Sequence, residues 1–113
     1  MEPTPNWVQF SFLYNQLGGA LHNAAQYDKA LENYRKALTI VLKQLGPGHP
    51  RVATSYNNIG EVHRAKGEYD KALKNFRKSL AIWLKQLGSG HPLVAASYNN
   101  IGAVHDAKGE YAK

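Results

Sequence analysis

The sequence predicts an all-α protein, an α-solenoid in which helical hairpins stack side by side. Two observations support this prediction: the 113 residues repeat with a period of 42, and apolar side chains within each copy recur every three or four positions. No segment alternates apolar and polar residues with a period of two, so we expect no strand. Because a single hairpin cannot bury both of its faces, the copies are expected to share one continuous core.

The repeat can be read directly from the sequence. Tyr14, Tyr56 and Tyr98 each open one copy, and the first two copies are identical at about 24 of 42 aligned positions. The segment YDKALENYRKALTIVLKQLGPGHP aligns without a gap on YDKALKNFRKSLAIWLKQLGSGHP, and the third copy runs YNNIGAVHDAKGEYAK. We therefore expect an N-terminal segment (1–10) that leads into a repeat domain (11–113). Its repeats are expected at about 8–49 and 50–91, with a partial third at 92–113.

Five helices are expected, over about 8–24, 27–45, 50–66, 69–87 and 92–108. The first, third and fifth share one pattern, which is clearest in the third helix, where the residues of one face recur after four, three and four positions: Val52, Tyr56, Ile59 and His63. Pro50 suits the first turn of this helix, with His49 just outside it. Gly67 supplies the left-handed residue that ends it.

The second and fourth helices carry a longer apolar stripe and stop at a glycine. In the fourth helix the stripe ends before Gly88 and consists of Tyr69, Ala72, Leu73, Phe76, Leu80, Leu84 and Leu87. Gly60 lies in the middle of the third helix, where a glycine costs about 1 kcal/mol of helix propensity. We expect that it allows a neighbouring helix to approach closely.

Small residues at the expected helix crossing and large residues at fixed offsets mark the second copy: Tyr56, Ile59, Gly60, Tyr69, Ala72 and Phe76. The first copy repeats them at Tyr14, Leu17, Gly18, Tyr27, Ala30, Tyr34 and Ala37, and the third at Tyr98, Ile101, Gly102 and Tyr111. This pattern resembles that of the tetratricopeptide repeat family over nearly all of residues 11–113.

The repeat is longer than the family's usual period of about 34 residues. The additional residues lengthen the second helix of each repeat and the loop after it. This longer form, with LG..HP.VA...NN at the joint, is similar to the repeats of kinesin light chains. The resemblance implies a right-handed superhelix whose first helices line a concave groove. It also implies a non-catalytic protein–protein interaction scaffold that binds a peptide segment in that groove.

Amide side chains on the first helices are candidate ligands for such a peptide. An Asn side chain offers a donor and an acceptor, so it can bond both the N–H and the C=O of an extended segment. The groove side would carry Asn15, Gln16 and His22 in the first copy, Thr54, Asn57, Asn58, Glu61 and Arg64 in the second, and Asn99, Asn100 and Asp106 in the third. The alternative is that the paired Asn residues bond neighbouring helices or face water.

The composition excludes several classes of protein. The chain has no cysteine, so neither a disulfide nor a thiolate metal site can form, and no apolar run approaches the ~20 residues of a membrane span. The start MEPTPNWVQF lacks the basic residues and the apolar middle of a signal peptide. We expect a soluble protein of the cytoplasm with no membrane partner.

The formal net charge of +6 raises a weaker alternative function, nucleic-acid binding by the outer, convex face. The second helices carry the basic residues on one stripe: Lys29, Lys36 and Lys43, then Lys71, Lys74, Lys78 and Lys85. No aromatic residues interleave with these lysines as stacking platforms, so a solvated face is the favoured interpretation.

We expect no metal, no cofactor and no catalytic residue. No two histidines stand three or four positions apart, and no pair of carboxylates accompanies them. Ser55 and Ser97 lie near helix starts and lack the strained turn of a nucleophile. The protein is therefore not expected to be an enzyme.

Apolar side chains at both ends of the repeat domain predict self-association. The third copy stops where its second helix should begin, and an apolar cluster precedes the first repeat. The candidate residues are Trp7, Phe10, Val94, Tyr98, Ile101 and Val104. Two interpretations remain open: a fragment of a longer array, natural or designed, or a dimer or larger homo-oligomer, with or without exchange of helices. A self-assembling segment with no specific ligand is thus the main alternative function.

Overall fold

The computed structural model describes residues 6–109, and this range contains five helices and no strand. The helices are α1 (Asn6–Asn23), α2 (Tyr27–Leu45), α3 (Pro50–Ala65), α4 (Tyr69–Leu87) and α5 (Pro92–Ala107). Every helix end lies within two residues of its predicted position. The largest difference is at the start of α1, which already includes Trp7 because this side chain packs against the core cluster around Val41 and Val52. Tyr111, the last position of the repeat pattern, lies outside the described residues.

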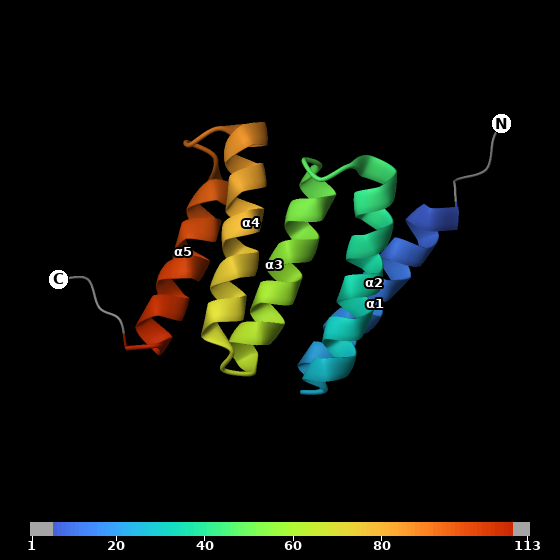
Figure 1. Cartoon of the computed structure of the whole chain (residues 1–113), viewed down its shortest axis with the longest axis horizontal. Helices are drawn as coiled ribbons and strands as arrows, with labels where there is room; N and C mark the ends of the chain where they lie inside the picture. The colour runs from blue at the N-terminus through green and yellow to red at the C-terminus, as the bar shows by residue number, and fades with distance from the viewer. Residues whose placement is uncertain (1–5, 110–113) are drawn as a thin grey trace.

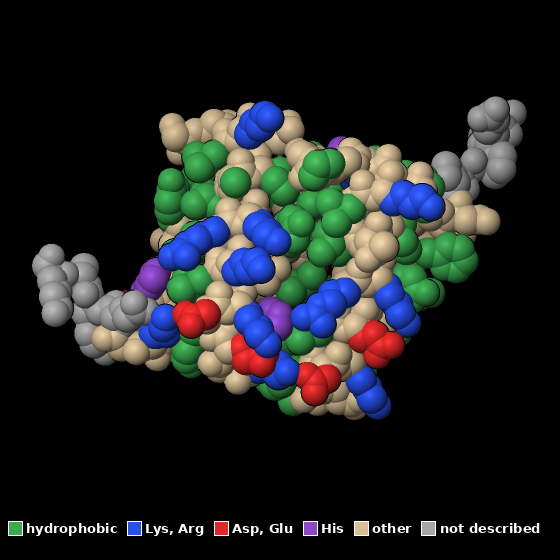
Figure 2. Space-filling model, in the orientation of Figure 1, with side chains coloured by type: hydrophobic (Ala, Val, Ile, Leu, Met, Phe, Trp, Pro, Cys, Tyr) green, Lys and Arg blue, Asp and Glu red, His purple; other side chains and the backbone are tan. Residues whose placement is uncertain are grey.

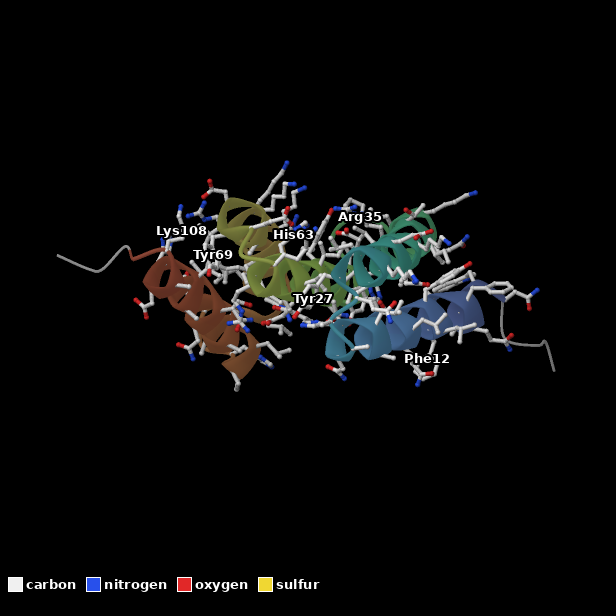
Figure 3. The ribbon with its side chains drawn as sticks, turned by 90° about the horizontal axis from the view of Figure 1, so that it is seen from below. Phe12, Tyr27, Arg35, His63, Tyr69 and Lys108 are labelled. Carbon is white, nitrogen blue, oxygen red and sulfur yellow. The ribbon has the colours of Figure 1, made fainter. Side chains whose placement is uncertain are left out.

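The helices pack in sequence order, each against the next: α1 on α2, α2 on α3, α3 on α4 and α4 on α5. Figure 1 shows the row of antiparallel helices from the side. Seen from below, α2 and α4 lie on one side of the molecule, α1 and α5 lie on the other, and α3 lies between them (Figure 3). The molecule measures 58 × 34 × 18 Å. The predicted α-solenoid, with two full hairpins and one additional helix, is confirmed.

The core consists of three apolar clusters, and each of them crosses from one hairpin to the next. The first joins Ala30, Leu31 and Tyr34 of α2 to Ile59 and Val62 of α3. The third repeats this arrangement between α4 and α5, where it is formed by Ala72, Leu73, Phe76 and Val104. The second lies at the other end of the helices and contains Val41, Val52, Ala53 and Ile82. The copies therefore share a continuous core, as the 42-residue period predicts.

Within each full hairpin an aromatic ring of the second helix packs directly on a glycine of the first. A Cβ atom at Gly18 would lie 2.6 Å from the ring of Tyr34, and one at Gly60 would lie 2.7 Å from the ring of Phe76. Real Cβ contacts are essentially never this short, so only glycine permits this helix spacing. The close approach predicted at Gly60 is confirmed.

The joints between hairpins also carry a repeated ion pair. The Nζ atom of Lys66 lies 2.5 Å from Oδ1 of Asp28, and that of Lys108 lies 2.7 Å from Oδ1 of Asp70. The hydrogen bond to Asp28 raises the pKa of Lys66, and the hydrogen bond from Lys108 lowers the pKa of Asp70. Both Asp side chains are almost fully exposed, so the pairs contribute little stability.

Proline and histidine together start α3 and α5. The Nδ1 atom of His49 accepts a hydrogen bond of 3.0 Å from the backbone N–H of Arg51, and His91 accepts the same bond from Leu93 at 3.1 Å. Pro50 and Pro92 stand at the first helical position, where a missing N–H has no cost. The two prolines and histidines that recur in the sequence are therefore helix-start signals.

The structure corrects part of the predicted self-association surface. Val94 and Val104 are 1% and 0% exposed because both face the body of the protein, and so neither lies on its surface. Trp7 and Ile101 are half-buried against core clusters. Phe10 remains 51% exposed and Tyr98 54% exposed.

Candidate functional site

The first helices α1, α3 and α5 enclose two small pockets, one between each neighbouring pair. The pocket between α1 and α3, called here the N-pocket, has a volume of about 190 Å³ and is lined by Ser11, Phe12, Asn15, Val41, Arg51 and Thr54. The pocket between α3 and α5, the C-pocket, has about 230 Å³ and is lined by Thr54, Asn57, Trp83, Leu93, Ala96, Ser97 and Asn100. Both are smaller than the roughly 300–1,000 Å³ of small-molecule sites, so each suits a single side chain.

The two pockets are copies of one another, shifted by one repeat. Five lining positions of the N-pocket recur 42 residues later in the C-pocket: Phe12 and Thr54, Asn15 and Asn57, Val41 and Trp83, Arg51 and Leu93, Thr54 and Ala96. Thr54 lines both pockets because α3 forms a wall of each. The repeat therefore produces a periodic groove rather than one isolated cavity.

The copies differ in chemistry. Arg51 and the exposed ring of Phe12 give the N-pocket a cation and an aromatic surface. Figure 3 shows Phe12 projecting from α1 away from α2. In the C-pocket an apolar residue, Leu93, replaces the arginine, and the large indole of Trp83 replaces a valine. The groove thus has a basic end and an apolar end.

Amide side chains bridge the first helices inside the groove. The Nδ2 atom of Asn100 donates to Oδ1 of Asn57 over 3.0 Å, which ties α5 to α3. Asn15 is the equivalent of Asn57 one repeat earlier, and its Oδ1 atom is buried without a hydrogen-bond partner within residues 6–109. Since an amide has two donors and an acceptor with two lone pairs, the bonded pair still has hydrogen-bonding capacity left.

The structure brings four of the predicted groove residues together at the pockets: Asn15, Thr54, Asn57 and Asn100. Asn58 is half-buried, and Gln16 and Asn99 are exposed, without lining either pocket. The charged and aromatic candidates lie elsewhere on the first helices. His22 stacks edge-on against Tyr27, Glu61 and Arg64 pair with each other, and Asp106 is exposed.

Several pocket residues were missed at the level of sequence, and the ones that give the pockets their chemistry are Phe12, Arg51, Trp83 and Leu93. A signal for three of them was present. Between Tyr27–Ser55 and Tyr69–Ser97 the two copies differ at eight positions, and three of these differences line the pockets: Val41/Trp83, Arg51/Leu93 and Thr54/Ala96. Differences between near-identical repeats therefore point to the groove.

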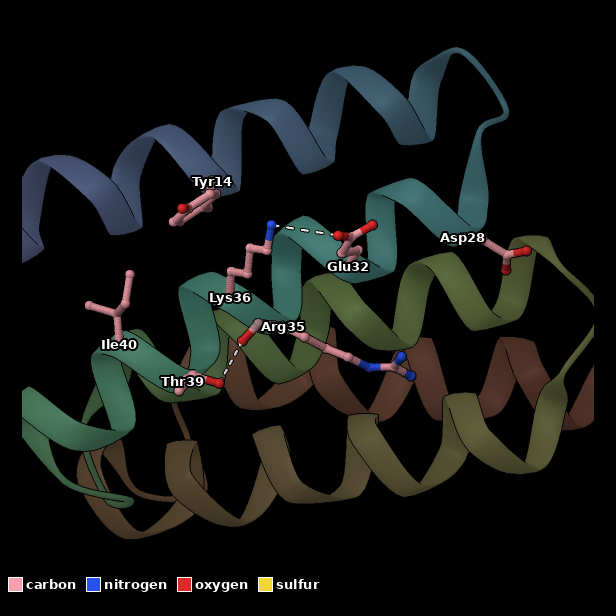
Figure 4. A pocket seen from close by; sticks show the side chains of 7 residues that line it. All are labelled: Tyr14, Asp28, Glu32, Arg35, Lys36, Thr39 and Ile40. Atoms are coloured by element: carbon pink, nitrogen blue, oxygen red, sulfur yellow. Dashed lines mark hydrogen bonds and ion pairs between the residues drawn. The ribbon is translucent and has the colours of Figure 1, made fainter.

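A larger hollow of about 610 Å³ lies outside the groove, along α2 and Tyr14 (Figure 4). Three of its charged side chains have partners: Lys36 pairs with Glu32 at 3.5 Å and approaches the Tyr14 ring to 5.5 Å, while Asp28 pairs with Lys66. The next repeat shows the same Lys–Tyr contact between Lys78 and Tyr56. We interpret this hollow as part of the repeat architecture and not as a separate site.

The predicted lysine stripes lie on the exposed side of α2 and α4, the face seen in Figure 2. Acidic side chains lie among the basic ones in the lower half of this view. Lys71, for example, lies 3.6 Å from Glu68. The charges are therefore mixed, in keeping with a solvated face.

No group of three or more His, Asp or Glu side chains within residues 6–109 is arranged to hold a metal ion. In the same range, no helix combines the length and the apolar character needed to cross a membrane.

Comparison with known proteins supports the architecture. A family model described as tetratricopeptide repeat matches residues 9–82 and 51–113. The crystal structure of BtubC (BKLC) from P. vanneervenii is similar, with a TM-score of 0.83 and 22% identity over 96% of this chain and 42% of that one. No curated protein sequence matches the chain.

A second similar structure contains the nearly identical TPR-like repeats of a Podosopora anserina protein assigned as a kinesin light chain. Its TM-score is 0.78 with 25% identity over 88% of this chain and 47% of that one. A variant of the same protein gives a TM-score of 0.77 at the same identity and coverage. The chain thus spans less than half the length of these structures.

Proposed function

Because the chain belongs to the tetratricopeptide repeat family, with repeats of the kinesin light chain-like type, we propose that its groove binds an extended peptide segment of a partner protein. Repeats of this family generally mediate protein–protein interaction or scaffolding and are generally non-catalytic. The observation that supports the proposal is the pair of repeat-equivalent pockets. Two equivalent, side-chain-sized pockets in one groove suit a polymer whose side chains also recur at regular intervals.

The amides between the pockets support an extended ligand. Asn57 and Asn100 use one donor and one acceptor on each other. The second N–H of Asn100 and the N–H groups of Asn57 can donate to a peptide carbonyl, and the oxygen of Asn100 can accept from a peptide N–H. Backbone recognition of this kind holds a segment whatever its side chains are. Selectivity is then left to the pockets.

The pocket chemistry predicts which side chains are selected. A polar or acidic side chain fits the N-pocket, where Arg51 supplies a cation. An apolar side chain fits the C-pocket against Trp83 and Leu93. The ligand is therefore a segment with one polar and one apolar anchor in a set order along the groove.

A pocket exchange tests this proposal. Phage-displayed random peptides are selected on the full chain and on the double variant Arg51→Leu/Leu93→Arg. Both residues are exposed, and the exchange keeps the composition and net charge. We expect the wild type to enrich peptides in which the polar and apolar anchor side chains follow one another in one order along the peptide. The variant should enrich peptides with the two anchors in the reverse order.

The matched control exchanges another pair of repeat-equivalent residues, Glu32→Lys/Lys74→Glu, on the outer face. It should select the same peptides as the wild type. Asn57→Ala/Asn100→Ala should weaken capture without changing the order of anchors. No enrichment by the wild type, or an enriched set that the pocket exchange leaves unaltered, contradicts the proposal.

A second candidate function, self-association, is favoured by the outer face of α1. Phe10, Leu13 and Leu17 form a stripe at helical spacing and are 51%, 49% and 43% exposed. Leu13→Glu/Leu17→Glu should then reduce the mass measured by sedimentation at micromolar concentration. Gln9→Glu adds charge to an exposed position of the same helix and should not. A wild-type chain that sediments as a monomer argues against this candidate.

A further inference from the structure

Among the described residues, nothing covers one side of α5. It is the side that corresponds to the side of α3 that packs on α4. Gly60 is buried in α3, whereas its equivalent Gly102 is exposed. Tyr98 is 54% exposed. No heavy atom of residues 6–109 lies within 4 Å of an ideal Cβ built on Gly102. This side of α5, called here the α5 seat, is a helix-packing surface against which none of the helices within residues 6–109 packs.

The two full hairpins show what such a seat holds. In both, an aromatic ring of the second helix covers the glycine: Tyr34 on Gly18, and Phe76 on Gly60. Two residues after the ring, a lysine lies over the tyrosine of the first helix, with Nζ 5.5 Å from the ring centroid for Lys36 and 5.2 Å for Lys78. Both hairpins thus have the same two contacts, a ring on the glycine and a lysine over the tyrosine. In both, the second helix supplies them from an aromatic residue and a lysine two positions later, the pattern aromatic-x-Lys.

We infer that the α5 seat, formed by Tyr98 and Gly102, binds one amphipathic helix of a second polypeptide that carries an aromatic-x-Lys pair. The ring packs on Gly102, and the ammonium group lies over the ring of Tyr98. An exposed tyrosine face attracts a cation, and this attraction sets the register of the incoming helix. The seat lies on a different side of α5 from the pocket residues, so the inference does not depend on the groove.

Gly102 makes the seat selective for a docked helix. The two equivalent contacts leave no room for a Cβ, since one would come within 2.7 Å of the ring. In the chain by itself, however, the Cβ of an alanine at 102 meets open space, and alanine is the better helix former. Gly102→Ala therefore separates docking from folding: it removes the ring site and leaves the free protein at least as stable.

The test uses a synthetic peptide with the sequence of residues 69–87, acetylated, amidated and labelled with a fluorophore, which is a helix of the required pattern. Its fluorescence anisotropy is followed while the full chain is added up to about 1 mM. This high concentration is needed because an isolated helix of this length must be ordered on binding, which weakens its affinity. We expect saturable binding that Gly102→Ala weakens at least tenfold. Asn99→Ala, a change at an exposed neighbour on the groove side, should have no effect.

Changes in the peptide probe each contact separately. Alanine in place of its phenylalanine should abolish binding, and glutamate in place of the lysine two residues later should weaken it several-fold. Tyr98→Ala in the protein should weaken binding of the parent peptide but not that of the glutamate peptide. Circular dichroism checks the fold, and Gly102→Ala should raise the melting temperature, by about 4 °C.

Three results would overturn the inference. The first is no saturable binding by the wild type. The second is equal binding by Gly102→Ala, which would mean that the peptide displaces α4 or binds elsewhere. The third is a wild-type dimer that Gly102→Ala dissociates, which would assign the seat to a second copy of this chain.

Discussion

The Nδ1 atom of His63 lies 2.9 Å from Oε1 of Glu68, across the turn that joins α3 to α4. His63 is only 3% exposed, so its ring is held between the helices while the carboxylate reaches it from the solvent side. The hydrogen bond with His63 lowers the pKa of Glu68, and the nearby Lys66 and Lys71 lower it further. The contact closes the second hairpin at its turn.

The first prediction concerns pH. Because the pKa of Glu68 is lowered from its ordinary value of 4.5, its carboxylate stabilises the fold above that pH, and this contribution is lost as the pH falls below it. Glu68→Gln should therefore lower the melting temperature at pH 7, with a difference from the wild type that shrinks as the pH falls below about 4.5. If the melting temperatures of Glu68→Gln and the wild type differed by the same amount at every pH, the prediction would be contradicted.

The second prediction compares two glycines at equivalent positions. Gly60→Ala forces a Cβ against the buried ring of Phe76, at an overpacking cost of about 1–3 kcal/mol that exceeds the gain in helix propensity. Gly102→Ala meets no atom and should stabilise by up to about 1 kcal/mol. Urea denaturation measures both changes. If both substitutions changed the free energy of unfolding in the same direction, the ring-on-glycine contact would be refuted.

The third prediction concerns the turn between α1 and α2. Ala25 has φ of 59°, where the equivalent turns have Gly67 at 78° and Gly109 at 81°. A left-handed conformation costs a residue with a Cβ about 1–2 kcal/mol, part of which is offset because glycine is more flexible in the unfolded chain. Ala25→Gly should stabilise the protein by about 0.5–1 kcal/mol in urea denaturation. Ala24→Gly, one residue earlier, should destabilise it, and a loss of stability in both variants would argue against strain at Ala25.

The fourth prediction concerns the amide bridge in the groove. Asn57→Ala and Asn100→Ala each remove one partner of the hydrogen bond that ties α3 to α5. A double-mutant cycle should give a coupling free energy of about 1 kcal/mol. Asn99→Ala, at an exposed position, should change stability by less than about 0.5 kcal/mol. Additive effects of Asn57→Ala and Asn100→Ala would mean that the bridge contributes nothing in solution.

Prediction from sequence was accurate wherever a short stretch contains its own signal. Pro50 and Gly67 mark the ends of α3 within a few residues of themselves, and the spacing of Val52, Tyr56 and Ile59 shows which face is apolar. It was less accurate for contacts that depend on how two hairpins meet. Val94 has the same local pattern whether or not it is covered, and only the structure shows it to be 1% exposed.

The sequence alone therefore determined the number, length, order and pairing of the helices, because periodicity, capping residues and glycine positions act over one or two turns. The tertiary structure decided which side chains share a pocket and which helix face is left open. Arg51 and Asn15 lie 36 positions apart in the sequence and line the same pocket only because α1 and α3 pack with one particular offset along their axes. That offset follows from how the side chains of adjacent hairpins interlock, a property of the packed interface that no local stretch of sequence contains.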